Sequence, residues 1–507
     1  MNINSNNMET VKFINLKKSG LRFFMSIVVL MLFATGCKDQ LETKVFSQLT
    51  PDNFYNSESD FNSAVVALYN PFTSDWGNSA AEGGYVALYN ANNRSYLLRS
   101  MLTTDEMENG WDMNLENFNW QPSSFIGTGG SAVYYRIAHV ARATSAIENM
   151  SKSKANVPDA IKNNYIAQAK TLRAWLMYIL YDFYGPVNAK TDPATLASQV
   201  IEPRPTDDVY IAQIEKDLTE AMPNLKDMYN GDPNNWGRVS QGVARMLLLK
   251  LYMHTKQWVK AEAVGKDIIG MGYALQPNYA DVFKVKKNNE VIFAISCSTT
   301  APNWYPQHLF PDDYASSPFI TRGGGWYGYS MPWAFFDKFD ANDLRSKKTI
   351  ISTYTNTSGG TTSRSTGLRG AIPLKYTGIT GPGTSYTEDV VIFRLGEVYL
   401  SVAEAINEQR GPADAYTFVN AIRARAGVSN FSGMTKDSFR DAILDERGRE
   451  LYAEGTRRQD LIRHGKFISG ALARGKAADP WEVHFPIPSD VINQANGVIA
   501  QNDGYTN

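Results

Sequence analysis

Two stretches of this chain combine aromatic rings with carboxylates, and both could do chemistry on a sugar. Asp105, Glu106 and Glu108 cluster beside Trp111, and Asp312–Asp313 lie in a second aromatic stretch. Aromatic faces stack on the C–H faces of sugar rings, and carboxylates accept hydrogen bonds from sugar hydroxyls. Two facing carboxylates are also what glycoside hydrolysis requires. The acids therefore fit sugar binding and sugar cleavage alike, and solvated loop acids without either role are the commoner case.

Other catalytic motifs lack the surroundings that their chemistry needs. Gly323-x-Gly325-x-x-Gly328 has the spacing of a dinucleotide fingerprint, but Pro332 follows at once and no strand pattern precedes it. The run 470–476 nearly forms a phosphate loop, but Ala477 replaces the hydroxyl residue that would hold magnesium. No H-E-x-x-H or G-x-S-x-G motif occurs. We therefore expect no nucleotide, no metal and no other cofactor.

The composition excludes further classes of function. Lys and Arg number 50 against 51 Asp and Glu, so there is no basic excess for nucleic-acid binding. Two Cys and five His are too few for a disulfide framework or a Cys-rich metal site. The aromatic content is high, at 12%. We expect a chain of this composition to fold, and the high aromatic content is the feature of the composition that needs an explanation.

The N-terminal residues predict a targeting signal rather than a folded element. Residues 1–36 carry four basic residues and then the apolar run Phe23–Ala34, which is too short for a spanning helix of about 20 residues. The run ends in Ala34-Thr35-Gly36-Cys37, which resembles a bacterial lipobox. Cys37 would then be lipidated, and residues 37–49 would tether the protein to a membrane. The alternative is a short signal-anchor with an incidental cysteine.

Helical periodicity dominates the remainder, which we expect to form a single domain over residues 50–507. Apolar residues recur at helical spacing in about 130–270 and 391–470. Small and large residues alternate in the pair 240–254 and 258–270, as in a tetratricopeptide unit, and a weaker copy starts at Leu395. Between them, the run 291–297 predicts a strand that buries Cys297, and Ser352–Gly370 predicts a mobile loop. The fold class is therefore mostly α, with helix pairs as the scaffold.

Two regions have no clean period and are expected to carry function. They are about 70–128 and about 300–390, rich in Gly, Asn and aromatic residues. The run Asp445–Arg463, by contrast, alternates acids and bases at helical spacing. Exposed pairs add little individually, but a network of Arg forks can fix helix packing. We interpret that run as structural.

Several strings, in order along the chain, resemble the SusD/RagB family of outer-membrane nutrient-binding lipoproteins. Asp503 stands where the family ending usually has Pro, and Lys38-Asp39 resembles a surface-export signal. The strings are Thr50–Asp60, Tyr184–Val187, Thr206–Ala221, Phe336–Arg345, Arg394–Glu404, Glu446–Arg463, Phe485–Pro488 and Gln501–Tyr505.

The resemblance implies a SusD-like, mostly α-helical body with irregular ligand-binding loops and no catalysis. It implies a surface-exposed lipoprotein of the cell outer membrane that binds an oligosaccharide or polysaccharide. It also implies a partner, a SusC-like TonB-dependent transporter, to which the glycan is delivered. No nucleic acid is expected as a partner.

The resemblance and the residues point to the same candidate ligand contacts. Trp111 matches the family's site tryptophan, and Asp112 follows it. Trp326 and Tyr327 lie just before the string Phe336–Arg345. Trp304 with Tyr305 and Trp76 are further candidates on loops, whereas Trp175, Trp258 and Tyr399 lie on helix faces and are expected in the core.

Two other classes of function remain open on the sequence. A glycoside hydrolase would use the acids near Trp111 and would release reducing sugar. A helical-repeat adaptor that binds only proteins would show no saturable binding of a small ligand.

Overall fold

The computed structural model describes residues 54–74, 86–125, 133–318, 320–376 and 386–506. The predicted signal peptide, Cys37, the tether at 37–49 and Trp76 lie outside the described residues. The chain divides into two units, Met1–Phe54 and Tyr55–Asn507, and every element below belongs to the second.

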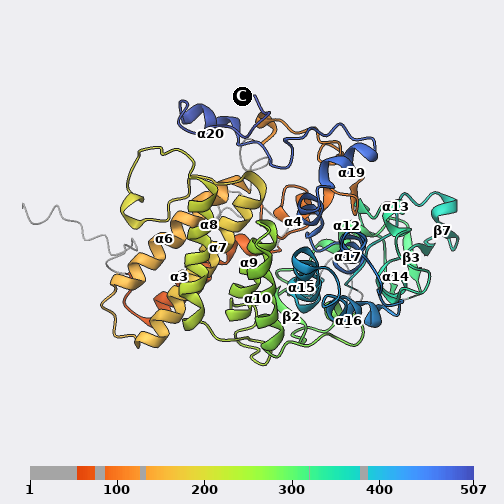
Figure 1. The fold of residues 1–507 in the computed structure, drawn as a ribbon, viewed down its shortest axis with the longest axis horizontal. Helices are drawn as coiled ribbons and strands as arrows, with labels where there is room; N and C mark the ends of the chain where they lie inside the picture. Colours follow the sequence, from red (N-terminus) through yellow and green to blue (C-terminus); the bar gives the residue numbers. More distant parts are fainter. Residues whose placement is uncertain (1–53, 75–85, 126–132, 319, 377–385, 507) are drawn as a thin grey trace, which may run out of the picture. The chain divides into compact units, whose positions relative to one another are not determined.

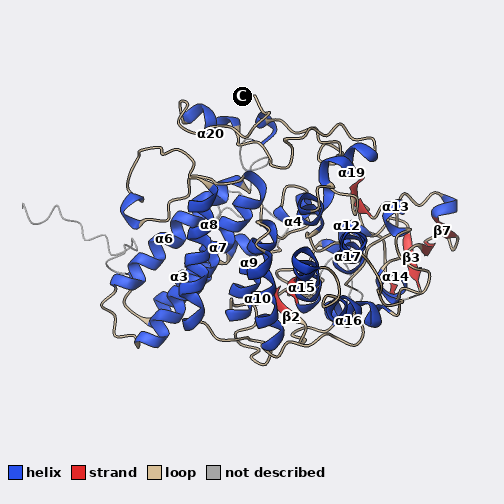
Figure 2. Cartoon of the chain, in the orientation of Figure 1, coloured by secondary structure: helices blue, strands red, loops and turns tan. Residues whose placement is uncertain are grey.

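Helices are the predominant secondary structure of the second unit, and the strands are short (Figure 2). The N-terminal helices are α3 (Glu58–Leu68), α4 (Tyr96–Leu102), α6 (Ile137–Lys152), α7 (Asp159–Tyr184), α8 (Asp207–Ala221), α9 (Gln241–His254) and α10 (Trp258–Gly270). Short helices follow: α11 (Asp281–Lys284), α12 (Tyr305–Leu309), α13 (Trp333–Phe336) and α14 (Leu344–Thr349). The C-terminal helices are α15 (Leu395–Arg410), α16 (Tyr416–Ala426), α17 (Lys436–Leu451), α18 (Arg457–Arg463), α19 (Phe467–Ala473) and α20 (Ser489–Gln494).

The long helices pack in series and form the scaffold (Figure 1). Successive helices from α6 to α10 pack against one another. The last of them, α10, also packs against α15, although more than a hundred residues separate the two in the sequence. A Cβ on Gly265 would lie 2.4 Å from Val402 Cγ2, so glycine permits this close approach of α10 and α15. The predicted helix-pair scaffold is confirmed. The helices on either side of the inserted region pack directly against each other, although the insertion separates them in the sequence.

Local signals explain where the helices begin and end. The Ser240 hydroxyl accepts a hydrogen bond from Val243 N and caps α9. The helix α7 ends at Gly185, whose φ of 70° lies in the left-handed region, and Pro186 follows. Thr206 stands at the N-cap of α8, although its side chain makes no capping bond.

The strands lie in the loop-rich parts of the chain. They are β1 (Glu108–Asn109), β2 (Val291–Ile295), β3 (Tyr314–Ser317), β4 (Ile320–Thr321), β5 (Tyr329–Ser330), β6 (Thr353–Asn356), β7 (Thr361–Ser363) and β8 (Val390–Arg394). Antiparallel pairs join β1 to β5 and β2 to β8, and a four-stranded sheet has the order β4-β3-β6-β7. The stretch Ser352–Gly370 was predicted to be a mobile loop, but it contains β6 and β7. Its β-branched threonines pair across the ladder Thr353↔Ser363 to Thr355↔Thr361.

The core is aromatic at its centre. Trp175 on α7 is buried, and its ring centroid lies 4.6 Å from that of Phe72, 4.9 Å from that of Phe393 and 5.1 Å from that of Phe293. Its indole N–H donates to the Tyr89 hydroxyl at 2.9 Å, so the one polar atom of the ring is satisfied. The predicted core position of Trp175 is confirmed, while Trp258 and Tyr399 are partly buried and pack against the same core.

Two further findings concern the described ranges alone. None of their helices combines the length and the apolar character needed to cross a membrane. Nor do three or more His, Cys, Asp or Glu side chains gather there as a group that could hold a metal ion.

The Cys297 thiol is buried, as predicted, and lies 3.2 Å from the Ser74 hydroxyl. Burial raises the pKa of this thiol to about 11.

Candidate functional site

The two irregular regions meet in a short ribbon. Strand β1 pairs with β5 in the register Glu108↔Ser330 and Asn109↔Tyr329. The next backbone group continues the pairing, because Gly110 N donates to the Gly328 carbonyl at 2.7 Å. Segments more than two hundred residues apart in the sequence are therefore held together directly before Trp111 and directly after Trp326.

Backbone hydrogen bonds fix the second segment against α12 and the turn that follows it. The amides of Gly325, Trp326 and Tyr327 donate to the carbonyls of Pro311, Gln307 and Phe310, at 3.0, 2.7 and 2.9 Å. A Cβ on Gly325 would lie 2.5 Å from the Gln307 carbonyl oxygen. Gly325, the second glycine of the run that resembles a nucleotide fingerprint, thus permits close backbone packing here.

Two buried rings form a floor beneath Trp111 and Trp326. The His308 and Tyr329 rings stack with centroids 5.4 Å apart and an interplanar angle of 18°. The ring centroid of Trp111 lies 5.4 Å from that of His308, at 65°, and the centroid of Trp326 lies 4.8 Å from it, at 87°. Both indoles therefore stand steeply on the same imidazole.

The indoles above this floor are open to solvent. The exposed fraction is 54% for Trp111 and 42% for Trp326, values that are unusual for tryptophan. Trp304, which is partly buried, stacks on Trp326 with centroids 5.9 Å apart and an angle of 17°. We call Trp111, Trp304, His308, Trp326 and Tyr329 the aromatic platform.

A glycine makes the position of Trp111 possible. A Cβ on Gly328 would lie 2.4 Å from the Trp111 ring. Because real Cβ atoms do not approach that closely, any larger residue at 328 would displace the ring. The ribbon therefore both joins the two segments and leaves room for Trp111 to lie over it.

The floor of the aromatic platform carries no charge at neutral pH. Burial lowers the pKa of His308 to about 3, so the imidazole stays neutral, and burial also raises the pKa of Tyr329. The Tyr329 hydroxyl donates to the Ala91 carbonyl at 2.9 Å and anchors the floor to the loop before α4. A ligand on the aromatic platform would meet ring faces and edges rather than a charge.

His308 and Tyr329 were missed in the sequence analysis. A weak signal existed for His308, because it follows Trp304 by four residues and the two share a face once α12 forms. Tyr329 had no such signal, since its place depends on the pairing of β5 with the distant β1.

The structure separates two predicted residues from the aromatic platform. The Tyr305 ring is buried, 4% exposed, with its centroid 6.4 Å from that of Tyr376, so it packs inside rather than reaching the surface. Tyr327 has a left-handed φ of 44°, and its hydroxyl donates to the Gly370 carbonyl at 3.0 Å. The Arg369 guanidinium lies 4.4 Å from the centroid of the Tyr327 ring. Tyr327 therefore braces a neighbouring turn.

Of the acids that precede Trp111, Asp105 has structural partners and Glu106 is buried, which corrects the expectation of solvated loop acids. Asp105 accepts two bonds from Arg457, at 2.7 and 2.8 Å, and one from Lys338 at 3.1 Å. Burial alone would raise the pKa of Asp105, but these two cations hold it well below its usual range. Glu106 is buried, and burial raises its pKa well above the usual range.

Asp112 lies beside the aromatic platform in a polar hollow of about 260 Å³. Its carboxylate accepts a hydrogen bond from Asn114 N at 3.0 Å. The hollow also has Asn93, Arg94, Asn114 and Asn119 in its wall. Amide, guanidinium and carboxylate groups are the partners that sugar hydroxyls require.

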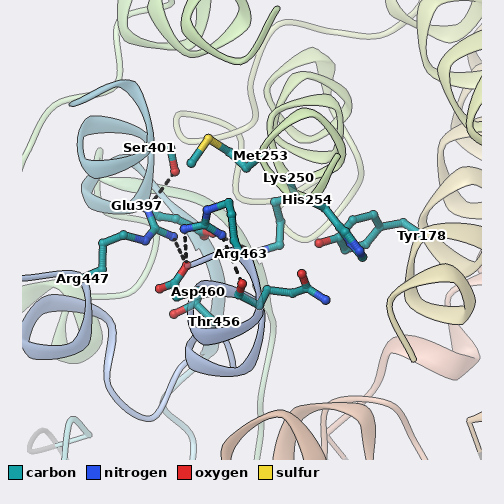
Figure 3. Close-up of a pocket in the computed structure, with 11 residues that line it drawn as sticks. Tyr178, Lys250, Met253, His254, Glu397, Ser401, Arg447, Thr456, Asp460 and Arg463 are labelled. Atoms are coloured by element: carbon teal, nitrogen blue, oxygen red, sulfur yellow. Dashed lines mark hydrogen bonds and ion pairs between the residues drawn. The ribbon is translucent and has the colours of Figure 1, made fainter. Parts of the chain in front are cut away.

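A second pocket lies inside the helical scaffold and is far smaller (Figure 3). Its volume is about 20 Å³, room for a single water molecule. Asp460 accepts from Arg447 at 2.9 Å and from Arg463 at 2.8 Å, and both ion pairs are buried. This pocket belongs to helix packing and cannot hold a sugar.

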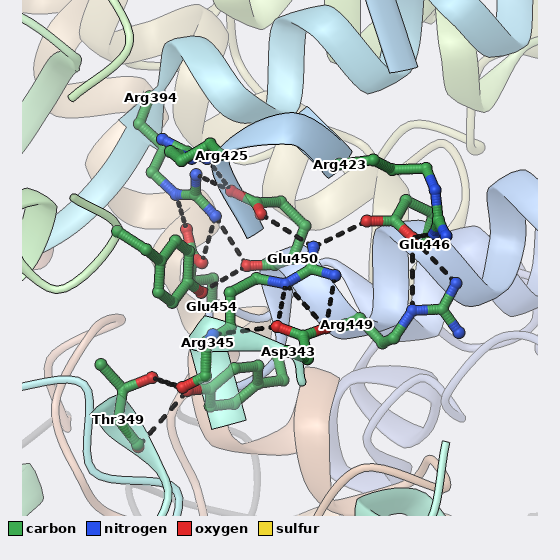
Figure 4. Close-up of polar contacts among 12 residues, drawn as sticks. Asp343, Arg345, Thr349, Arg394, Arg423, Arg425, Glu446, Arg449, Glu450 and Glu454 are labelled. Atoms are coloured by element: carbon green, nitrogen blue, oxygen red, sulfur yellow. Dashed lines mark hydrogen bonds and ion pairs between the residues drawn. The ribbon is translucent and has the colours of Figure 1, made fainter. Parts of the chain in front are cut away.

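Three acids of the C-terminal run, Glu446, Glu450 and Glu454, join a buried network with residues from earlier in the chain (Figure 4). Arg345 pairs with Asp343 at 2.8 Å and with Glu446 at 2.7 Å, and Arg394 pairs with Glu450 and Glu454, both at 2.7 Å. The predicted structural ion pairs are present, but they are buried rather than on exposed helix faces. We call these six residues the charge network: Asp343, Arg345, Arg394, Glu446, Glu450 and Glu454.

Fold and site together define a helix-pair scaffold whose loops present an exposed aromatic platform. The SusD family model matches residues 350–505. Among curated proteins, the SusD-like protein P25 of Formosa agariphila is 24% identical over 95% of this chain and 98% of its own length. The starch-binding protein SusD of Bacteroides thetaiotaomicron is 25% identical, over 80% of this chain and 84% of its own.

Solved structures share the fold. Surface glycan-binding protein A of Bacteroides thetaiotaomicron, in complex with laminarihexaose, has a TM-score of 0.69 at 24% identity and covers 88% of this chain and 99% of its own. A laminarin-binding SusD-like protein has a TM-score of 0.71 at 22% identity, covering 89% of this chain and 100% of its own. These structures show the fold that the chain shares, and the predicted SusD-like fold is confirmed.

Proposed function

We propose that this protein captures an oligosaccharide or polysaccharide on the aromatic platform, outside the cell. The observation that carries the proposal is the pair of exposed indoles, Trp111 and Trp326, standing on one neutral imidazole. Ring faces held in this way suit the C–H faces of sugar rings, and a neutral floor suits an uncharged ligand. Trp304 extends the stacking surface beyond Trp326.

The relatives support the class of ligand. One is named as starch-binding, and one structure holds laminarihexaose. Starch and laminarin differ in linkage, so the relatives support glycan binding without selecting one glycan for this chain. The platform residues Trp111, Trp304 and Trp326 are the contacts that we assign to the ligand, with Asp112 as a hydroxyl partner.

The protein then delivers the glycan to a SusC-like TonB-dependent transporter, as the family resemblance implies. The lipobox at Cys37 would hold it at the outer membrane surface. Cys37→Ser is expected to abolish labelling by a fatty-acid analogue and release the protein from the membrane fraction. Co-purification with the transporter from solubilised membranes tests the partner, and a transporter that never co-purifies would contradict this part.

Binding occurs without cleavage. Asp105 is engaged by Arg457 on α18 and by Lys338, and Glu108 accepts from the Ser330 hydroxyl at 3.0 Å across the ribbon, so both acids have structural roles. Incubation with a bound glycan is expected to release no reducing sugar. Steady release by the purified protein would favour the glycoside hydrolase instead.

Isothermal titration against a glycan panel that includes starch and laminarin oligosaccharides tests the binding proposal. Replacing either exposed indole by Ala is expected to weaken affinity roughly 30-fold, the size of a loss of about 2 kcal/mol at a binding hot spot. Trp258→Ala on α10 is the control, because it removes the same side chain from the scaffold. Normal binding by folded Trp111→Ala and Trp326→Ala variants would overturn the site. Binding to peptides but to no glycan would overturn the function.

A further inference from the structure

The polar hollow beside the aromatic platform is built from two segments, one before and within α4 and one after Trp111. It is continuous with the platform along the chain, because Asp112 follows Trp111. It is also joined to the floor, because the Tyr329 hydroxyl donates to the carbonyl of Ala91, three residues before Arg94. The residues of the wall that matter here are Asn93, Arg94, Arg99, Asp112, Asn114 and Asn119.

Two guanidinium groups face this hollow. Arg94 is exposed, and within the described ranges its side chain forms no ion pair. Arg99 on α4 is 4% exposed, and burial lowers its pKa, with the charge of Arg94 lowering it further while Tyr184 raises it. The two cations are therefore close enough to repel each other, and an anion bound there would relieve the repulsion.

The acids of the neighbouring loop do not cancel this charge. Asp105 is held by Arg457, and Glu108 accepts from the Ser330 hydroxyl with Arg369 at 3.8 Å. Glu116 accepts from Asn109 N, and burial raises its pKa to about 7. Among the residues that the structure describes, Asp112 is the one acid in the wall of the hollow, beside two guanidinium groups.

We propose that the hollow is a subsite for an anionic substituent, a uronate carboxylate or a sulfate ester, of the glycan that stacks on Trp111. This inference rests on the proposed function and names the substrate class more narrowly. The planar guanidinium of Arg94 suits the paired oxygens of either anion. Asp112 and the asparagines then bind hydroxyls of the same sugar, since a carboxylate accepts only from donors.

Matched ligands test the subsite. A laminarin and a starch oligosaccharide are each titrated beside two derivatives of equal length, one oxidised to the carboxylate at C6 and one sulfated. At least one derivative is expected to bind about fivefold tighter than its neutral parent, the upper range for one partly exposed ion pair. Raising the salt from about 0.05 M to about 0.5 M should remove most of that preference and leave the neutral affinity unchanged.

Variants assign the preference to one residue. Arg94→Gln is expected to abolish the preference and keep neutral binding, while Arg94→Lys retains part of it. Arg245→Gln on α9 makes the same change of charge on the scaffold and should change neither affinity. The carboxylate and sulfate arms show which anion the subsite takes.

The outcomes separate the two proposals. If neutral and anionic ligands bind the wild type equally, or if Arg94→Gln keeps the preference, the subsite is overturned and glycan binding stands. If no neutral or anionic oligosaccharide binds at all, the proposed function itself fails.

Discussion

The aromatic platform and the charge network both join distant parts of the chain, but they do so with opposite chemistry. In the platform, backbone pairing between β1 and β5 does the joining, and the side chains of Trp111 and Trp326 are left facing solvent. In the network, the side chains themselves do the joining, and Arg345 and Arg394 are fully buried. Figure 4 shows how each guanidinium there is surrounded by carboxylates.

The difference shows which groups are available to a ligand. A buried arginine with several carboxylate partners has its donors engaged, so the network holds helices in place and cannot also bind a sugar. The indoles of Trp111 and Trp326 are positioned by backbone pairing and remain exposed to solvent. We therefore expect ligand binding where the backbone makes the contacts, and the larger contribution to stability where charged side chains make them.

The largest effect is expected from breaking the charge network at Arg394. Its guanidinium pairs with Glu290 at 3.0 Å and with Glu450 and Glu454 at 2.7 Å, so Arg394→Met removes one cation from three buried carboxylates at once. Breaking a buried ion pair in this way costs about 3–5 kcal/mol of unfolding free energy. Denaturant titration of both proteins measures the loss.

An exposed pair provides the control. Arg364 and Asp337 lie 3.0 Å apart, but their side chains are 57% and 53% exposed. Arg364→Met is therefore expected to change the unfolding free energy by less than about 1 kcal/mol. Equal losses from the two variants would contradict the claim that burial gives the network its weight.

Much of the scaffold could be predicted from the sequence, because helix periodicity is local. The face that recurs along α7 and the small residues of α9 and α10 were visible without any tertiary contact. The charge run in α17 and α18 was also visible, but its burial was not, since burial depends on the distant helix α14, which brings Arg345 against Glu446. The β-hairpin in 353–363 was hidden by a composition typical of mobile loops.

The candidate site was predictable only as a set of rings. Trp111, Trp326 and Trp304 come together as expected, but the two-residue strands that bring them together have no periodic signal. The neighbours Trp304 and Tyr305 end in different places because α12 starts between them, which buries the Tyr305 ring. Such outcomes are set by long-range pairing, which spacing does not encode.

A smaller effect, confined to binding, is expected from Gly328→Ala. The new Cβ would meet the Trp111 ring, and the crowding costs about 1–3 kcal/mol unless the exposed ring moves away. The ring can move, so we expect about a tenfold loss of glycan affinity with little change in stability. Gly323→Ala is the matched control, since nothing lies within 4 Å of a Cβ there. A Gly328→Ala protein that binds like the wild type would remove Trp111 from the site.

A still smaller effect on stability is expected at Glu116, beneath the ribbon. Burial raises its pKa to about 7 from the usual 4.5 of a glutamate, so between these values the folded state holds a proton that the unfolded state has lost. Stability from this group therefore falls as the pH rises through that window. Glu116→Gln keeps the acceptor for Asn109 N and should raise the melting temperature by about 1–3 °C at pH 8 and not at pH 4.5. Asp267→Asn, an exposed carboxylate on α10, should show no such dependence on pH.

The smallest expected effect is the absence of a pH response in binding, and it tests the neutral floor directly. Burial lowers the pKa of His308 to about 3, below the usual value of about 6.5 that it regains on unfolding. As the pH falls below 6.5 the unfolded state takes up a proton at His308 that the folded state refuses, so the contribution of this group to stability falls. The imidazole under Trp111 and Trp326 nevertheless stays neutral, and the affinity for a neutral glycan should change less than about twofold between pH 5 and pH 8.

Titrations across that range, on protein shown to be folded, measure this change in affinity. An affinity that fell with a midpoint near pH 6 would mean that the imidazole titrates in the folded protein. The platform would then present a charge, as the network does, and the contrast between the two regions would fail.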